Sequence, residues 1–426
     1  MRALVIAPEP FFTARGTPFS VYYRTLLMAE SGVSIDLLTY GQGQDVDLPG
    51  VRLIRIPALR WLGAVRVGPS ALKAVHDVLI AVWTVALLLR KRYDVVHAHE
   101  ESVFIARLLK PVFRFQLIYD MHSSLPQQLE NFQYTSSRLL IWLFERLELA
   151  SLTGADAVIT ICPELARFAI ERMPDPRRHF LIENSLLDEV RLKPNSHTAP
   201  ETGEVEPPVP ADRPLILYAG SFEPYQGLHL LIAAFARVRE RRPDAFLVVM
   251  GGLPDQVRRV RAQALAHGLD GHCVVAGRVP QHVARQFTQR ATSLVSPRDR
   301  GTNTPLKIYE QLASGIPLVA TRILSHTQIL NDQVSILVEP TVEGLADGIF
   351  ESLHDTERRQ RVIAGALALY DEKYSRPVYA RGVRAVLDLI QRGCAAQRSR
   401  LVVSYHARDA VAASVTREES AASPSR

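Results

Sequence analysis

Short apolar stretches of strand length alternate with helical stretches along most of this 426-residue chain, and this alternation limits the folds open to it. The chain begins with an apolar run at Ala3 to Ala7, a loop, a helical pattern at about Phe19 to Ser31 closed by Gly32, and a second apolar run at Val33 to Thr39. A strand, a helix and another strand in this order predict a parallel sheet covered by helices. We therefore predict an α/β protein with doubly wound parallel sheets, in which ligands bind at the carboxyl ends of the strands.

The alternation is interrupted at Lys193 to Pro214, KPNSHTAPETGEVEPPVPADRP, and resumes with an apolar run at Leu215 to Ala219. A proline-rich polar stretch without apolar periodicity is typical of a linker between domains. A chain of this length also exceeds the usual size of a single core. We predict a first Rossmann-like domain at residues 1–190, a linker at 191–213 and a second Rossmann-like domain at 214–370. The small, polar and aperiodic residues 392–426 predict a disordered tail.

The composition is that of a soluble globular protein, with 47% hydrophobic and 22% charged residues. The net charge of +6 favours anionic partners, but the chain has no zinc-finger or helix-turn-helix signature and no interleaved basic and aromatic residues, so we expect no nucleic-acid partner. Three widely spaced cysteines, Cys162, Cys273 and Cys394, give neither a disulfide framework nor a metal motif. They indicate a reducing compartment, and we expect the protein in the cytoplasm.

No stretch is predicted to span a membrane, and the apolar run at the N-terminus is too short for a signal peptide. Residues Val78 to Leu89 are apolar nearly all round, which predicts a helix of the core. The preceding stretch mixes Arg60, Trp61, Arg66 and Lys73 with apolar residues. Such a mixture also fits contact with an anionic membrane surface, so a peripheral position on the cytoplasmic face is the alternative location.

The stretch from Arg298 to Thr321, RDRGTNTPLKIYEQLASGIPLVAT, predicts a loop, a short helix and a strand. Thr304 suits the N-cap of the helix, and Pro305 suits its first position because it has no N–H group to leave unpaired. Gly315 suits the left-handed position after the last turn.

Lys307 and Glu310 are three residues apart and therefore lie on one face of this helix. The start of a helix attracts phosphate, and a carboxylate about one turn further along can accept hydrogen bonds from a ribose diol. This spacing fits a nucleoside diphosphate lying along the helix. The alternative is a capped helix with a solvated Lys/Glu pair.

The sequence PLKIYEQLASGIPLVAT resembles the nucleotide-sugar signature of the retaining family-4 glycosyltransferases, which have the two-domain GT-B fold. The resemblance implies that Glu310 holds the donor ribose. Many members have a second glutamate that touches the donor sugar, and Thr302 stands at that position here. Gly301, Thr302, Asn303 and Thr304 would then supply these contacts through backbone, hydroxyl and amide groups. The resemblance also implies that EKYSRPVYARGVRAVLDLIQ, within residues 371–391, is a closing helix that packs back on the first domain.

The turn GSFEPYQG, which begins at Gly220, departs from the family where an arginine and a lysine hold the donor diphosphate. Ser221 and Gln226 occupy these two positions. Losing two charge-assisted hydrogen bonds of roughly 1.5–3 kcal/mol each would lower affinity by about 10² to 10⁴. We predict that three cations near the helix start replace them, namely Arg298, Arg300 and Lys307.

Other candidate residues follow the ends of predicted strands. His122 stands just after the strand at Leu117 to Tyr119, where the family has a histidine that contacts the donor sugar, so the resemblance gives it a catalytic role beside Lys307 and Glu310. The resemblance places Gly16 near the donor phosphates and the acceptor, and assigns Arg278 and Val279 to the turn that holds the base. Gly251, at the end of a strand, and Leu306, at the start of the helix, complete the candidate donor site.

His97 and His99 alternate along the stretch DVVHAH and project on one side of a strand, as metal ligands can. Only these two ligands are well spaced, and the family has a similar strand without metal. We therefore expect no metal and no other cofactor.

The resemblance implies an enzyme that moves a sugar from a nucleoside diphosphate sugar to a hydroxyl of a glycan or lipid-linked acceptor, with retention of the anomeric configuration. Ser221, Gln226 and Thr302 also fit a non-catalytic scaffold or binding subunit on the same fold. A nucleotide-sugar epimerase is a further alternative, which explains the PLKIYE helix less well.

Overall fold

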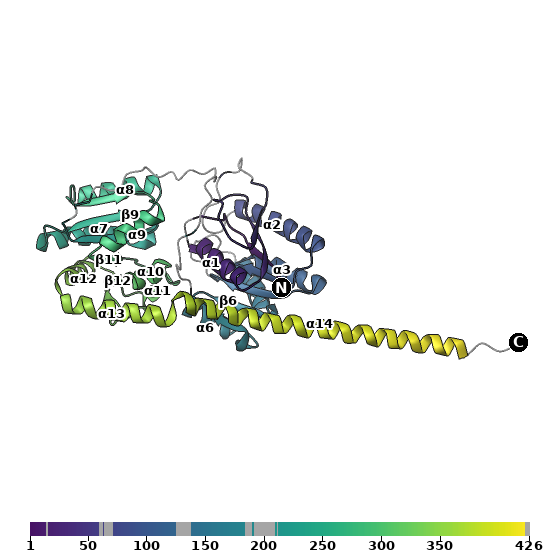
Figure 1. Cartoon of the computed structure of the whole chain (residues 1–426). Coiled ribbons are helices and arrows are strands. Elements are labelled where there is room, and N and C mark those ends of the chain that lie inside the picture. Colours follow the sequence, from purple (N-terminus) through teal and green to yellow (C-terminus); the bar gives the residue numbers. More distant parts are fainter. Residues whose placement is uncertain are drawn as a thin grey trace.

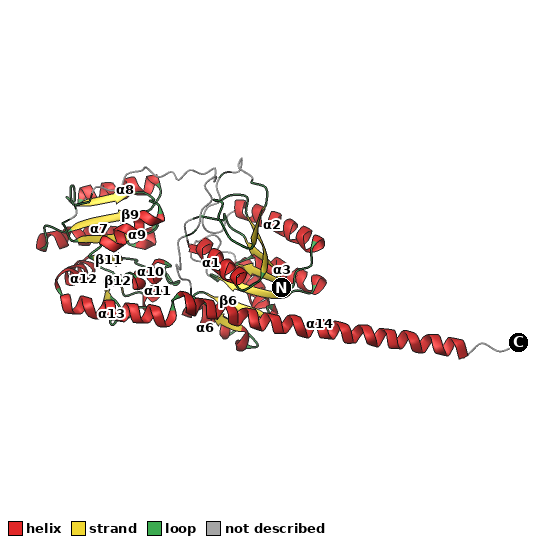
Figure 2. Ribbon diagram, in the orientation of Figure 1, coloured by secondary structure: helices red, strands yellow, loops and turns green. Residues whose placement is uncertain are grey.

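The computed structural model describes residues 1–13, 16–58, 63, 71–124, 138–183, 190, 209–210 and 212–421. These residues form two parallel sheets with helices on both faces (Figures 1 and 2). The structure thus confirms the prediction of two doubly wound α/β domains. Most of the predicted linker, 191–208 and 211, lies outside the described residues.

The first sheet has the order β3-β2-β1-β4-β5-β6-β7 in the described part of the chain, and all of its neighbouring strands are parallel. The strand order reverses between β1 and β4. At such a switch point the loops after neighbouring strands run to opposite faces of the sheet and leave a crevice between them. Its strands are β1 (Arg2–Ala7), β2 (Ser34–Thr39), β3 (Val51–Arg55), β4 (Val95–His99), β5 (Gln116–Met121), β6 (Ala157–Thr160) and β7 (His179–Leu181).

Both faces of the first sheet are buried, as the continuous apolar strands predict. Along β1, Ala3, Val5 and Ala7 point to one core, while Leu4 and Ile6 point to the other, because side chains alternate along a strand. The first core is covered by α1 (Gly16–Glu30) and by the beginning of α14 (Arg376–Ala421). The second core is covered by α2 (Ala71–Arg90), α3 (Ser102–Phe113), α5 (Arg138–Gly154) and α6 (Pro163–Ile170).

The second sheet has the order β10-β9-β8-β11-β12-β13 and reverses between β8 and β11. Its strands are β8 (Leu215–Ala219), β9 (Phe246–Met250), β10 (Cys273–Ala276), β11 (Ser293–Ser296), β12 (Leu318–Thr321) and β13 (Ile336–Val338). Its helices are α7 (Leu228–Arg241), α8 (Pro254–Ala266), α9 (Gln281–Arg290), α10 (Lys307–Ala313), α11 (Leu324–Thr327), α12 (Val342–His354) and α13 (Thr356–Lys373). Single 3-10 turns lie at η2 (Pro176–Arg178) and η3 (Pro224–Gln226).

Helix α14 crosses from the second domain to the first and then projects beyond it (Figure 1). Its first part, with Tyr379, Val383 and Leu387, joins the core of the first domain, as predicted for a closing helix. The prediction of a disordered tail from residue 392 was wrong, because the helix continues to Ala421. Gln397 donates to the Arg114 carbonyl at 2.8 Å, which anchors this extension. The tail contains no proline before Pro424 and is rich in alanine, so helical propensity outweighed its lack of apolar periodicity.

Helix α2 differs from its prediction as a core helix. His76, Ile80 and Leu87 are buried against the sheet, but Val78 and Val82 on another face are more than half exposed. In addition, residues Leu72–Arg90 are long and apolar enough to cross a membrane by length and composition, contrary to our expectation that no stretch would be. The apolar run at Val78 to Leu89 predicted a helix that is buried all round, but only the side of α2 that faces the sheet is buried.

Candidate functional site

The switch point of the second sheet brings together the turn after β8 and the loop after β11. At Gly227, where φ is +70°, an added Cβ atom would lie 1.8 Å from the Pro297 carbonyl oxygen. At Gly251, where φ is +120°, an added Cβ would lie 1.9 Å from the Gly220 carbonyl oxygen. No side chain fits at either position, so these glycines allow the turn, the β9 end and the β11 loop to pack in direct contact.

The Lys307 ammonium lies inside this junction although part of its side chain is exposed. Its Nζ atom lies 4.0 Å from the ring centroid of Tyr218, is inaccessible to solvent and has no hydrogen-bond partner in the described structure. Burial lowers the pKa of Lys307 well below its usual value, and neighbouring Arg298 lowers it further. This arrangement excludes the solvated Lys/Glu pair, and an anionic ligand would supply the missing partner.

Arg298 is the second cation of this junction. It is only 9% exposed, its guanidinium lies 5.1 Å from the ring centroid of Tyr225, and its Nη1 donates to the Asn303 carbonyl at 2.9 Å. Its Nε atom has no partner among the described residues, and burial lowers the pKa of Arg298. The structure thus brings Lys307 and Arg298 together, as predicted. It does not bring Arg300 to them, because that side chain is 72% exposed and pairs with Asp299 at 3.7 Å.

Ser221 and Gln226, which replace the family's two cations, are bonded to each other. Gln226 is 6% exposed and its Nε2 donates to Ser221 Oγ at 3.3 Å, while its Oε1 atom is buried and finds no partner in the part of the chain that the structure describes. The Ser221 carbonyl accepts from the Tyr218 hydroxyl at 2.7 Å. This turn therefore offers neutral donors to a ligand, and the positive charge comes from the other side of the junction.

Helix α10 is shorter than predicted. It begins at Lys307, its N-cap residue is Leu306, and no side chain caps it, so the predicted roles of Thr304 and Pro305 were wrong. The Ile308 N–H bonds to the Pro305 carbonyl at 3.0 Å, which makes a tight turn before the helix. Its end is as predicted, with Gly315 in the left-handed conformation at φ +70°. A helix of seven residues has a weak dipole, so an anion at this position would depend on the side-chain cations.

Glu310 lies one turn after Lys307. Its side chain is 36% exposed, and its carboxylate lies 4.0 Å from Arg285 Nε on α9. Burial raises the pKa of Glu310, and Arg285 opposes that shift. Arg285 was missed because an arginine on an amphipathic helix has no distinguishing sequence signal. The predicted base-binding pair stands just before α9, where Arg278 is exposed and Val279 packs partly against the second core of this domain.

The loop before α10 reaches the first domain. Asn303 Nδ2 donates to the His122 carbonyl at 3.1 Å, although 181 residues separate them. The Thr302 carbonyl accepts from Gln328, whose Oε1 accepts from the Glu164 N–H at 2.9 Å. Gly301 adopts φ +133°, which favours glycine. Asn303 thus connects the Lys307–Arg298 pair to His122 across the domain boundary.

His122 belongs to a buried network at the ends of β4 and β5. Its Nε2 lies 3.0 Å from His99 Nδ1 and 3.2 Å from Asp120 Oδ1, and its Nδ1 is buried without a partner among the described residues. Asp120 also binds His97 Nε2 at 2.9 Å and forms a buried ion pair with Arg24. Although burial alone would raise the pKa of Asp120, Arg24 and His99 hold it well below its usual value.

His97, His99 and Asp120 could offer three metal ligands, since their ligand atoms lie within 4.8 Å of one another. Burial lowers the pKa of both histidines. The cation that faces Asp120, however, is the Arg24 guanidinium, which also donates to the Ile182 carbonyl at 3.0 Å. We interpret this cluster as a structural ion-pair network beside His122.

Acidic side chains also lie near His122. Glu100 adopts the left-handed conformation at φ 50°, and its carboxylate accepts from Ser123 Oγ at 3.0 Å. Burial raises the pKa of Glu100 to about 7, and neighbouring His122 opposes that shift. Glu101 pairs with Lys73 on α2. A strained non-glycine residue at a strand end is common at functional sites, so Glu100 joins the candidates on the first-domain side.

Gly16 is the candidate least connected to this arrangement. It begins α1, is exposed, and has open space around an added Cβ atom. Residues 14 and 15 lie outside the described part of the chain.

Glu183 links the two domains from the end of β7. Its Oε1 accepts from the Tyr309 hydroxyl of α10 at 3.4 Å, and burial raises the pKa of its carboxyl to about 7. Because the folded state favours the protonated acid, the free energy of unfolding should fall as pH rises from about 4.3, the pKa of an unfolded glutamate, to about 7. This loss is at most about 4 kcal/mol and is complete above that range.

We predict that Glu183→Gln reduces by about one the number of protons released on unfolding between these pH values, since glutamine keeps the acceptor oxygen without titrating. The free energies of unfolding of both proteins in urea at about pH 5 and about pH 8 measure this change. Asp77 and Glu100 also titrate near 7 and contribute to both proteins, so the difference between wild type and variant isolates Glu183. An unchanged difference in stability between the two pH values would contradict this assignment.

Two family models match this chain. The model described as Glycosyl transferases group 1 matches residues 202–368, and the Glycosyl transferase 4-like domain matches residues 25–185. Two parallel-sheet Rossmann-like domains in one chain are the architecture of the GT-B class. The chain belongs to the group 1 glycosyltransferases.

Curated relatives align over part of their length. A D-inositol 3-phosphate glycosyltransferase of Xylanimonas cellulosilytica is 33% identical over 168 residues, which are 38% of this chain and 39% of that protein. A phosphatidyl-myo-inositol mannosyltransferase of Mycobacterium tuberculosis is 27% identical over 183 residues, 41% of this chain and 47% of that protein. The chain thus spans less than half the length of these relatives in the alignments.

Solved structures share the whole fold. Sucrose-phosphate synthase from Thermosynechococcus elongatus has a TM-score of 0.67 at 19% identity, covering 95% of this chain and 99% of that one. Anabaena HepE in complex with UDP-glucose has a TM-score of 0.63 at 14% identity, covering 91% of this chain and 99% of that one. These similarities confirm the predicted GT-B fold.

Proposed function

We propose that the protein transfers a sugar from a nucleoside diphosphate sugar to a hydroxyl of a glycan or lipid-linked acceptor, with retention of the anomeric configuration. The observation that carries this proposal is the buried pair Lys307 and Arg298, whose Nζ and Nε atoms have no hydrogen-bond partner among the described residues. A diphosphate is the anion that best fits two adjacent cations next to a half-exposed carboxylate. The family, and the curated relatives named as glycosyltransferases, support the same reaction.

In this mechanism the bond between the sugar and the diphosphate breaks as the acceptor oxygen forms a bond on the same face of the sugar. The acceptor's proton leaves with the diphosphate. Lys307 and Arg298 stabilise the negative charge that develops on the leaving group, so the proposal requires no divalent metal. Glu310 binds the ribose and thereby fixes the position of the donor.

His122 acts from the first domain in this proposal. Asn303 holds the His122 carbonyl, and Asp120 and His99 hold its ring nitrogen, so the histidine has a fixed position relative to the donor loop. We propose that it orients the sugar, and that Glu100 and its neighbours receive the acceptor hydroxyl. Three free cysteines support a reducing, cytoplasmic location.

Glu310→Ala tests the donor site. UDP, GDP or ADP at about one hundred times its Kd should raise the melting temperature of the wild type by about 5–10 °C, and the variant should lose most of this rise. Glu343→Ala is the matched control, because Glu343 also stands near a helix start in the second domain but pairs with Arg237 on the surface.

Three outcomes separate the candidate functions. Binding with transfer or donor hydrolysis supports the enzyme, whereas interconversion of free nucleotide sugars identifies an epimerase. Absence of binding to any nucleoside diphosphate favours a non-catalytic scaffold, the alternative that the neutral Ser221–Gln226 pair supports.

A further inference from the structure

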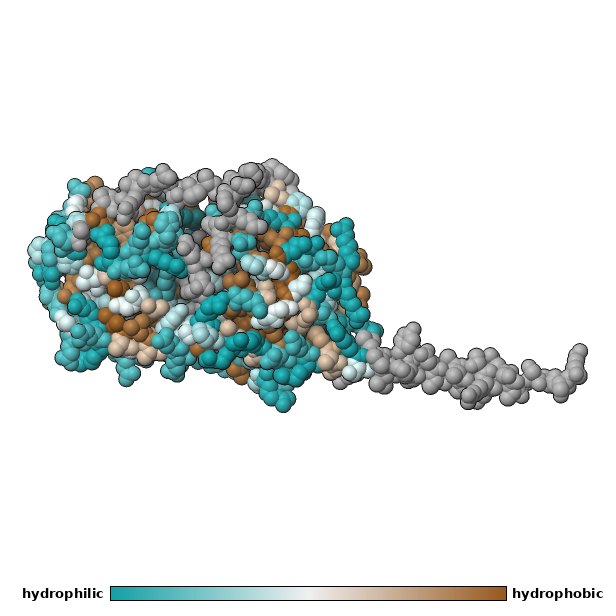
Figure 3. Space-filling model, viewed as in Figure 1, coloured by the Kyte–Doolittle hydropathy of each residue, from teal (hydrophilic) through white to brown (hydrophobic). Residues whose placement is uncertain are grey.

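Helices α2, α3 and α5 form one layer on the first sheet, and the outer face of this layer is strongly apolar. Of sixteen large apolar side chains that are exposed in the described part of the chain, ten belong to these three helices. They are Val75, Val78, Val82 and Leu89 on α2, Leu108 and Val112 on α3, and Leu139, Trp142, Leu143 and Leu149 on α5. In Figure 3 brown residues lie among teal ones where Figure 1 places α2 and α3. Apolar exposure concentrated on one face indicates an interaction surface.

Helix α2 is held in this layer and does not stand free as a membrane span would. Only 28% of its apolar stretch is buried, yet Ile80 and Leu87 are fixed in the core between α2 and the sheet. Tyr40, which follows β2, binds Asp77 of α2, and Lys73 binds Glu101. The helix therefore presents a face to a partner while its opposite side stays in the fold.

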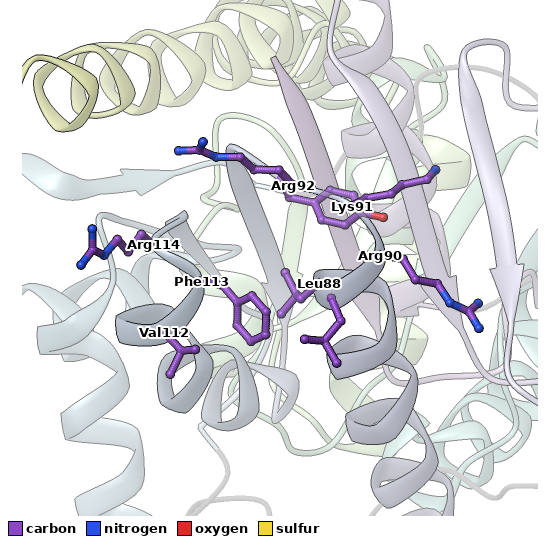
Figure 4. A pocket seen from close by; sticks show the side chains of 9 residues that line it. Leu88, Arg90, Lys91, Arg92, Val112, Phe113 and Arg114 are labelled. Atoms are coloured by element: carbon purple, nitrogen blue, oxygen red, sulfur yellow. The ribbon is translucent and has the colours of Figure 1, made fainter. Parts of the chain in front are cut away.

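A basic pocket lies at one end of the same layer. It has a volume of about 580 Å³ and is lined at the ends of α2 and α3 by apolar and cationic residues, with no acidic residue among them. Figure 4 shows Leu88 and Phe113 close together at its centre, with the side chains of Arg90, Lys91, Arg92 and Arg114 around them.

The positive charge of this pocket is largely uncompensated. Lys91 Nζ pairs with Asp36 at 3.0 Å. Arg90, Arg92 and Arg114 are exposed and make no ion pair within the described part of the chain. Three guanidinium groups that are unpaired within the described residues border these apolar side chains. They match the phosphates of an anionic lipid surface better than a second protein surface, because guanidinium binds phosphate through two parallel hydrogen bonds.

We propose that this layer docks on an anionic bilayer, with the pocket between α2 and α3 holding a lipid phosphate and the exposed apolar side chains entering the headgroup region. The three helices run in the direction opposite to the strands. Helix α2 therefore begins at the carboxyl edge of the sheet, where His122 lies, and ends about 30 Å away at the pocket. A bilayer along this face lies beside the first-domain half of the site. A lipid-linked acceptor in this bilayer then has a short path to that half of the site, an inference that rests on the proposed function.

Vesicle co-sedimentation tests the docking surface without donor or acceptor, so the result is independent of the transfer reaction. We expect the wild-type protein to bind vesicles of phosphatidylcholine with about 30% phosphatidylglycerol and to bind pure phosphatidylcholine far more weakly. Arg90→Gln with Arg92→Gln should lower binding to the anionic vesicles about thirtyfold, since each cation near such a surface contributes about fivefold. Arg258→Gln with Arg259→Gln, on exposed α8, has the same charge change and should have little effect.

A second double variant tests the exposed apolar side chains of this surface. Val78→Gln with Leu108→Gln should lower vesicle binding about tenfold while the melting temperature stays near that of the wild type, because both side chains are exposed. Vesicles should also shift the emission of Trp142 to shorter wavelength, measured as the difference from Trp142→Phe.

Equal binding to neutral and anionic vesicles, or unchanged binding by the Arg90/Arg92 variant, would overturn the proposal. Protein that resists extraction by alkaline carbonate would show that α2 crosses the bilayer instead. Binding of soluble glycerol phosphate without any vesicle binding would assign the pocket to a free phosphate compound, and would likewise overturn it.

Discussion

Replacing Lys307 with methionine is expected to lower donor affinity and turnover while raising the stability of the ligand-free protein. The ammonium is a charged donor to the diphosphate, and removing one such interaction in a buried site lowers kcat/KM by about 10² to 10³. The same ammonium is buried beside Tyr218 and Arg298 with no hydrogen-bond partner among the described residues, which destabilises the empty site by about 1 kcal/mol or more. The melting temperature without ligand should therefore rise by about 2–4 °C.

These opposite signs distinguish a binding role from a folding defect. Melting curves with and without nucleoside diphosphate, together with transfer rates, give both quantities for one variant. Arg298→Met should behave similarly, and the double variant should lose less than the product of the two single effects because both cations face one anion. Arg259→Met, on the exposed surface of α8, is the control. Full donor binding by Lys307→Met would reject the diphosphate site.

Asp120→Asn is expected to destabilise the protein by about 3–5 kcal/mol, because it leaves the fully buried Arg24 guanidinium without its counter-ion. This loss corresponds to a fall in melting temperature on the order of 10 °C. Arg24 also donates to the Tyr379 hydroxyl of α14 at 3.2 Å and to the Ile182 carbonyl, so the defect should spread to the packing of the closing helix.

The double variant Arg24→Met with Asp120→Asn should recover part of this loss, since it removes the uncompensated charge together with its partner. Asp332→Asn is the matched control, because it breaks an exposed pair with Arg322 and should change stability by less than about 1 kcal/mol. If Asp120→Asn melts within about 2 °C of the wild type, the ion pair does not stabilise the fold. Kinetics of the surviving protein would then show whether Asp120 acts only by positioning His122.

The sequence alone determined the order of the elements and several of their ends. Alternating apolar runs and helical patterns predicted both sheets, and Gly32 and Gly315 end their helices in the left-handed conformation that their residue type favours. Lys307 and Glu310 were also found from spacing on one helix. These features depend on residues a few positions apart, where propensity and periodicity act directly.

The tertiary structure decided what each charged group faces. In the sequence, Lys307 and Arg300 are similar cations near Glu310. In the structure the Lys307 ammonium is inaccessible to solvent, the Arg300 side chain is mostly exposed, and Glu310 lies beside Arg285. The same holds for the pairing of Arg24 with Asp120, 96 residues away.

The two largest errors had a related cause. The tail beyond residue 392 was read as disordered although its alanine-rich sequence continues α14, and α2 was read as a core helix although one side of it is exposed. Periodicity reports how apolar residues are spaced, but burial depends on which surfaces distant segments cover. A local pattern therefore determined where helices and strands form, while desolvation and charge pairing depended on contacts that only the folded chain makes.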